Sequence, residues 1–179
     1  MTQNEVPGPL AVNQDDLAVR DTRDASLEQK LVHMLSNLEY LRSCLEEFQA
    51  QGDPGQAVET ATALVNQVVE FSQRHLDAEA QAPARAKLED FLASAGRLRE
   101  QVNGSLMKSV LGLFGRKTAD SPQRRQSARE VSRRMADVLE CYFALLTGCF
   151  QSPAPAGRWR ETSGVFLGDL KRVLEKLEE

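Results

Sequence analysis

The sequence predicts an all-α fold: an elongated up-and-down bundle of four long helices and a shorter fifth helix at the C-terminal end, with coiled-coil-like packing. Three observations predict it. Apolar residues recur at alternating steps of four and three residues through most of the 179-residue chain, which is the spacing of one face of an α-helix. No segment alternates apolar and polar residues between turn signals, so no sheet is expected. Proline and glycine fall in short stretches between the periodic blocks and mark the helix ends.

Residues 1–25 are predicted to be a disordered acidic tail. They have no apolar period, they contain Pro7, Gly8 and Pro9, and residues 1–24 carry a charge balance of −3. The segment also lacks the basic and apolar regions of a secretory signal. Residues 26–179 are expected to form a single helical domain.

The first helix is predicted over residues 27–50. Ser26 and Gln29 have the spacing of a capping box, and Gly52 is suited to the position just after the helix end. The apolar stripe continues without a break through Leu27, Leu31, Met34, Leu38, Leu41, Leu45 and Phe48.

The second and third helices are predicted over residues 54–80 and 84–114. Asp53 and Pro54 suit the N-cap and first position of the second helix, and Pro83 precedes the third. The second stripe is Ala57, Ala61, Leu64, Val68, Phe71, His75 and Ala78, and its small residues predict a closely packed helix. The third stripe is Ala84, Leu88, Phe91, Ala95, Leu98 and Val102.

The fourth and fifth helices are predicted over residues 122–150 and 163–178. Ser121 and Pro122 open the fourth, whose stripe is Ala128, Val131, Met135, Val138, Tyr142, Leu145 and Cys149. Because residues 151–160 contain two prolines and a glycine, they are predicted to be a linker. The fifth stripe is Phe166, Leu170, Val173 and Leu177.

An unusually apolar segment closes the third predicted helix, and we expect it to bind a partner. On a helical wheel its apolar side chains cover an arc of about 160°; they are Leu106, Met107, Val110, Leu111, Leu113 and Phe114. The alternatives are that this segment belongs to the core or that it contacts a membrane surface. Trp159, between two arginines, is a second candidate partner-binding residue, with folding back over the bundle end as the alternative.

The chain has a net charge of −4 but contains one strongly basic segment, residues 115–134, whose own net charge is +5. Its candidate anion-binding residues are Arg116, Lys117, Arg125, Arg129 and Arg133, the last three spaced to share one helix face. The alternative is a solvated face paired with acidic residues such as Glu46, Glu47, Glu70 or Asp77. The segment has no interleaved aromatic residues, so nucleic acid is not the expected partner.

No catalytic motif or metal-ligand spacing is present, and we expect no cofactor and no metal site. The residues three before the two histidines are Lys30 and Ser72, which excludes the Glu-x-x-His pair of a carboxylate-bridged metal bundle. His33 is considered as a phosphoacceptor but is expected to be an ordinary surface histidine. Three cysteines without paired spacing are expected to be reduced thiols, which favours a cytoplasmic protein.

These observations predict a non-enzymatic interaction module, meaning an adaptor, a chaperone-like protein or an assembly factor that uses the segment 106–114. The alternative is a binder of anionic surfaces, meaning a membrane or nucleic acid, through residues 106–134. The expected partner is a protein. A second copy of the chain or a membrane surface is kept as an alternative, because heptads satisfied within one chain look the same as heptads satisfied between chains.

Overall fold

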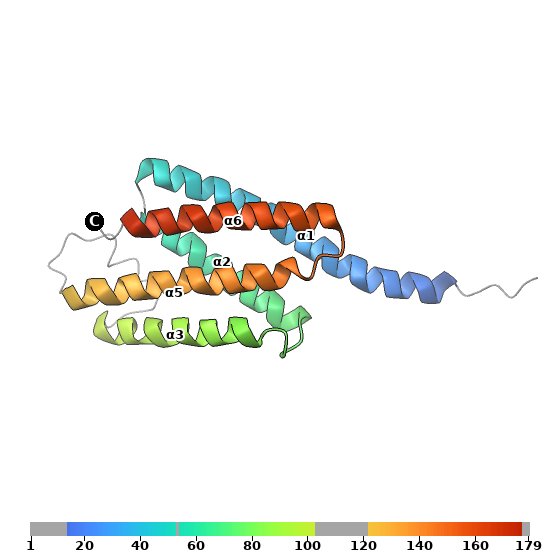
Figure 1. Ribbon diagram of the computed structural model, residues 1–179, viewed down its shortest axis with the longest axis horizontal. Helices are drawn as coiled ribbons and strands as arrows, with labels where there is room; N and C mark the ends of the chain where they lie inside the picture. The colour runs from blue at the N-terminus through green and yellow to red at the C-terminus, as the bar shows by residue number, and fades with distance from the viewer. Residues whose placement is uncertain (1–13, 53, 103–121, 177–179) are drawn as a thin grey trace, which may run out of the picture.

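The computed structural model describes residues 14–52, 54–102 and 122–176, and confirms the all-α bundle. The described residues form five helices and no strand. The helices are α1 (Gln14–Gln51), α2 (Pro54–His75), α3 (Ala82–Val102), α5 (Pro122–Thr147) and α6 (Pro153–Lys176). Successive helices run in opposite directions along an elongated bundle, as predicted (Figure 1).

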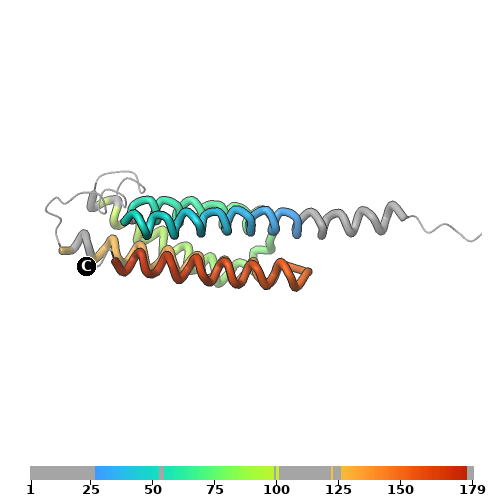
Figure 2. The backbone as a smooth tube through the Cα atoms, turned by 90° about the horizontal axis from the view of Figure 1, so that it is seen from above, coloured from blue at the N-terminus to red at the C-terminus, as the bar shows by residue number. Residues whose placement is uncertain are grey.

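The helices form two layers. One layer holds α1 and α2, and the other holds α3, α5 and α6 side by side (Figures 1 and 2). Helix α5 is the central member, because it packs against α2, α3 and α6, while α3 packs mainly against α5. The bundle is thus a unit of α1, α2, α5 and α6 with α3 attached to one side of α5.

The predicted apolar stripes form the core. In α1, Leu31, Met34, Leu38 and Leu45 are at most 4% exposed, and the α5 stripe is buried from Ala128 to Tyr142. The stripe of α2 ends earlier than predicted, since His75 and Ala78 are exposed. Four large apolar side chains of the described residues remain exposed: Val32, Tyr40, Leu92 and Val165.

The turns on either side of α2 have clear physical causes. Gly52 has a φ of 70°, a left-handed conformation that glycine adopts without steric cost, and this confirms its predicted position after α1. Helix α2 ends at His75, before the predicted residue 80, because Gln81 caps it from the next turn. The Gln81 amide donates to the carbonyl oxygens of Ser72 and Leu76 at 2.8 and 2.6 Å, and the Ser72 carbonyl oxygen also accepts from the Leu76 N–H at 2.9 Å.

Helix α6 begins at Pro153, ten residues before the predicted start, so the predicted linker is largely helical. Prolines at the first and third positions of a helix are compatible with it, because the first N–H groups have no partner within the helix. The Ser152 N–H is instead satisfied by Glu28 of α1, at 2.9 Å. Ser152 and Pro153 form the same helix-start signal as Ser121 and Pro122, which precede and open α5.

Helix α1 also begins earlier than predicted, at Gln14 rather than Leu27, so residues 14–25 of the predicted tail are helical. Residues 1–13 lie outside the described part of the chain, as do residues 103–121, which include the C-terminal part of the predicted third helix.

Candidate binding site between α5 and α6

Most of the predicted site residues fall outside the described residues. These are Leu106, Met107, Val110, Leu111, Phe114, Arg116 and Lys117. Arg125 lies in α5, and its side chain is likewise outside the described part. The structure therefore describes three of the predicted site residues in full: Arg129, Arg133 and Trp159.

Trp159 lies in the core and not at the surface. Its side chain is 0% exposed, and its indole Nε1–H donates to the carbonyl oxygen of Phe143 at 3.0 Å. The Phe143 ring packs edge-on against Trp159 and Phe166, with ring centroids 5.6 and 6.3 Å apart, and Phe150 lies 5.7 Å from Trp159. In this conformation a partner cannot reach Trp159, which argues against the predicted docking role and agrees with the fold-back alternative.

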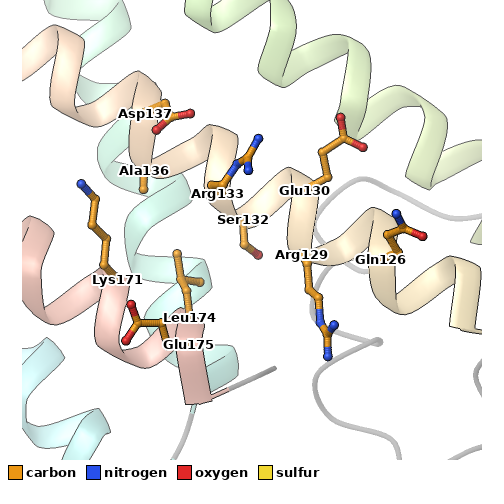
Figure 3. Close-up of a pocket in the computed structure, with 10 residues that line it drawn as sticks. All are labelled: Gln126, Arg129, Glu130, Ser132, Arg133, Ala136, Asp137, Lys171, Leu174 and Glu175. Carbon is orange, nitrogen blue, oxygen red and sulfur yellow. The ribbon is translucent and has the colours of Figure 1, made fainter. Parts of the chain in front are cut away.

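Arg129 and Arg133 are exposed on α5, one helical turn apart, and they line a pocket of about 680 Å³ between α5 and α6 (Figure 3). This volume is within the range of small-ligand sites. Helix α6 contributes Lys171, Leu174 and Glu175 to the lining. Two of the predicted basic residues thus line one pocket, and α6 adds side chains that the prediction did not connect to them.

The pocket has an unusual inner wall at Ser132. This residue is 4% exposed, and its hydroxyl has no hydrogen-bond partner. In Figure 3 its side chain points toward the side of Leu174 and Arg129, while Arg133 and Glu130 point away from them. A buried hydroxyl without a partner loses its hydration without compensation, so a polar group bound here would satisfy it.

The charges of the lining are balanced, and several are already paired. Lys171 on α6 reaches Glu140 of α5 at 3.2 Å. Glu130 accepts from Arg134 at 2.8 Å and lies 3.7 Å from Arg97 of α3. Arg134 also lies 3.8 Å from Asp90 of α3, so a network of ion pairs connects α3 to α5.

The expected acidic partners of the basic face are not those suggested by the sequence. Glu46 pairs with Arg42 on its own helix, at 3.1 Å, and Glu70 pairs with Arg74 on α2. The carboxylates that line the same pocket as Arg129 and Arg133 come from α5 itself and from α6; they are Glu130, Asp137 and Glu175.

Sequence reasoning missed Ser132, Lys171 and Leu174. A signal was present: Ala128, Ser132 and Ala136 are small residues spaced four apart, which marks a helix face where a neighbour approaches closely or a gap remains. Which helix fills that gap depends on packing, and the sequence period does not give it.

The lining contains charged and hydroxyl groups but no histidine or cysteine among its described residues, so its groups are suited to binding polar ligands. The three cysteines are free thiols. Across the described ranges no group of three or more His, Cys, Asp or Glu side chains is arranged to hold a metal ion. Nor is any helix in the described part of the chain both long and apolar enough to cross a membrane.

Comparison of the chain with protein-family models, with curated proteins and with solved structures finds no match.

Proposed function

We propose that this protein is a non-enzymatic interaction module, an adaptor, chaperone-like protein or assembly factor, which binds a protein partner through the apolar segment 106–114. The proposal assigns it to the cytoplasm, the compartment expected from three cysteines without a disulfide.

The observation that carries the proposal is how completely the described helices bury their own apolar stripes. Large core side chains such as Leu31, Leu64 and Leu139 are at most 1% exposed, and few large apolar residues of the described surface remain for a partner. The segment 106–114 is by contrast the most apolar stretch of the sequence. It connects the end of α3 to the start of α5, which lie at one end of the bundle (Figure 1). A concentrated apolar segment of this kind is suited to docking.

The test is affinity capture from native lysate with the wild-type chain and with the double variant Leu111→Asp/Phe114→Asp. The expected result is loss of a captured protein while circular dichroism shows unchanged helicity. The matched control is Leu92→Asp, which places the same charge on an exposed leucine of α3, 52% accessible in the structure, and is expected to capture the partner as the wild type does.

Two outcomes contradict the proposal. An identical capture profile from a folded double variant means that the segment does not bind the partner. Loss of helicity in the double variant, but not in Leu92→Asp, means that the segment belongs to the core and is not available for docking.

A second candidate function, the binding of an anionic surface, is favoured by one specific observation. Arg129 and Arg133 are both exposed, lie one turn apart on α5 and line one pocket, in the basic stretch that follows the segment 106–114 in the sequence. Several cations on one face bind membranes of anionic lipid in a salt-dependent way.

This candidate is tested by sedimentation with vesicles that contain anionic lipid, at low and high salt. The Arg129→Ala/Arg133→Ala variant is expected to bind several-fold more weakly than a control of equal charge, Arg42→Ala/Arg160→Ala. Binding that does not respond to salt, or that falls equally in both variants, would exclude this function.

A further inference from the structure

A second described pocket, of about 510 Å³, lies between α1 and α2 and contains both histidines of the chain. His33 comes from the middle of α1, and His75 is the last residue of α2. The sequence gives no reason to expect them together, since they are 42 residues apart (75 − 33) and only His75 lies on an apolar stripe. The antiparallel packing of α1 and α2 brings them to one groove.

The rim of this groove is basic. Lys30 and His33 line it from α1, and Arg74 and His75 line it from α2. Glu70 is the one acidic side chain of the described lining, and it is paired with Arg74. The guanidinium carries five N–H donors, so this pair leaves some of them for a ligand. The groove therefore differs from the α5–α6 pocket, whose positive and negative side chains balance.

The positive charges of the rim also act on His75. Its pKa is lowered from the ordinary value of 6.5, first by some desolvation of this largely exposed ring and then by the charges of Lys30 and Arg74. Two cations close enough to disfavour a third charge are also placed to attract an anion. An anion bound among them would favour the protonated histidine and raise this pKa.

The floor of the groove is apolar and partly aromatic. Met34 is 4% exposed, and Phe71 is half-buried in the groove lining. The rings of Phe71 and His75 lie with centroids 4.8 Å apart at 51°. Such a floor accepts a flat organic group better than it accepts water, because aromatic faces pack with further rings.

A polar contact joins the two helices beside the groove. The Asn37 amide donates to Oε1 of Gln67 at 2.8 Å, one turn along α1 from His33. This bond fixes α1 relative to α2 in the absence of a ligand, so the groups do not need to be ordered when a ligand binds.

We propose that the α1–α2 groove binds a small phosphate monoester carried on an aromatic ring, with Lys30, His33 and Arg74 around the phosphate and Met34 and Phe71 beneath the ring. A phosphate offers several acceptor oxygens to convergent N–H donors, and the charge-assisted bonds that form are about twice as strong as neutral ones. The site is distinct from the surfaces of the proposed function, so this proposal does not depend on that function.

The test uses the full chain and NMR of the two histidine rings, whose signals are the only ones of their kind in this sequence. Phenyl phosphate is the probe, and inorganic phosphate and phenol represent its two halves. We expect saturable shifts of both histidine signals with phenyl phosphate, a rise in the pKa of His75, and an affinity at least about tenfold higher than for either half. Lys30→Gln is expected to weaken binding by about fivefold or more, whereas Lys87→Gln, an equal charge change at an exposed lysine of α3, leaves it unchanged.

Three results would overturn the proposal. The first is the absence of saturable shifts up to about 10 mM phenyl phosphate. The second is equal affinity for inorganic phosphate, which would mean that the apolar floor contributes nothing. The third is an equal loss of affinity in Lys30→Gln and Lys87→Gln, which would show a response to net charge and not to a site. Far-ultraviolet circular dichroism of both variants establishes that each remains folded.

Discussion

The contact between α5 and α6 is built differently at its two ends. At one end, where α5 finishes and α6 begins, Trp159, Phe143, Phe150 and Phe166 fill the space between the helices. At the other end, where α5 begins and α6 finishes, the facing residues include Ser132 and Ala136, and a pocket of about 680 Å³ remains. The same two helices thus make a closed core and an open site.

The difference follows from side-chain size and hydrogen bonding. The indole of Trp159 fills its place and also finds an acceptor for its Nε1–H, so no polar group is left unpaired there. Ser132 is too small to reach across to α6, and its buried hydroxyl has no partner. One end therefore contributes stability, whereas the other gives up some stability and leaves a pocket open.

The largest expected effect is at the closed end. Trp159→Ala removes a fully buried ring and its hydrogen bond, and should lower the free energy of unfolding by about 3–5 kcal/mol. Urea unfolding followed by circular dichroism measures it. Trp159→Phe keeps most of the ring volume and should cost less. A stability loss of about 0.5 kcal/mol or less in Trp159→Ala, the level typical of a surface substitution, would contradict the burial of this residue.

A smaller effect of opposite sign is expected at the open end. Ser132→Ala removes a buried hydroxyl that has no partner, so stability should stay the same or rise by about 1 kcal/mol. The matched control is Ser94→Ala in α3, because Ser94 is equally buried but its Oγ donates to the Asp90 carbonyl oxygen at 3.0 Å and accepts from Arg97 at 3.2 Å. This control should lose about 0.5–1.5 kcal/mol. A loss in Ser132→Ala as large as in the control would show that the Ser132 hydroxyl has a partner in solution.

The two ends also differ in what the sequence could predict. The α5 face of the contact follows a regular stripe, and residues such as Val138 and Tyr142 were correctly predicted to be in the core. Trp159 was assigned to a linker because of the nearby Pro155 and Gly157. That assignment gave local propensity too much weight. Proline is acceptable in the first turn of a helix, and the contacts of Trp159 with α5 stabilise the helical conformation.

Only the α5 side of the α5–α6 pocket could be predicted from the sequence. The spacing of Arg129 and Arg133 determines that they share a face of α5, since that is a local property of a helix. Lys171 and Leu174 are about forty residues further along the chain, and their arrival beside Ser132 depends on the register of α6 against α5. The register of α6 against α5 is decided by packing between the two helices, including the packing around Trp159. The periodicity of one helix alone does not predict it.

The smallest expected effect concerns pH, and it separates the α5–α6 pocket from the α1–α2 groove. The described lining of the α5–α6 pocket has no histidine, whereas the groove has both, and in the folded chain the pKa of His75 lies below its ordinary value of 6.5. Between these two pKa values the unfolded chain binds more protons at this residue than the folded chain, so stability rises with pH across the window. The free energy of unfolding therefore has its full value, as far as His75 is concerned, above about pH 6.5, and it falls as the pH drops through the window.

Urea unfolding at a series of pH values, compared between the wild type and two variants, measures this effect. His75→Gln should flatten the pH dependence of stability, because it removes the titrating group. Lys30→Gln should flatten it only in part, since it removes one of the two cations that lower the pKa and leaves burial in place. A pH dependence that is identical in the wild type and in Lys30→Gln would mean that the groove does not have the positive potential on which its proposed ligand depends.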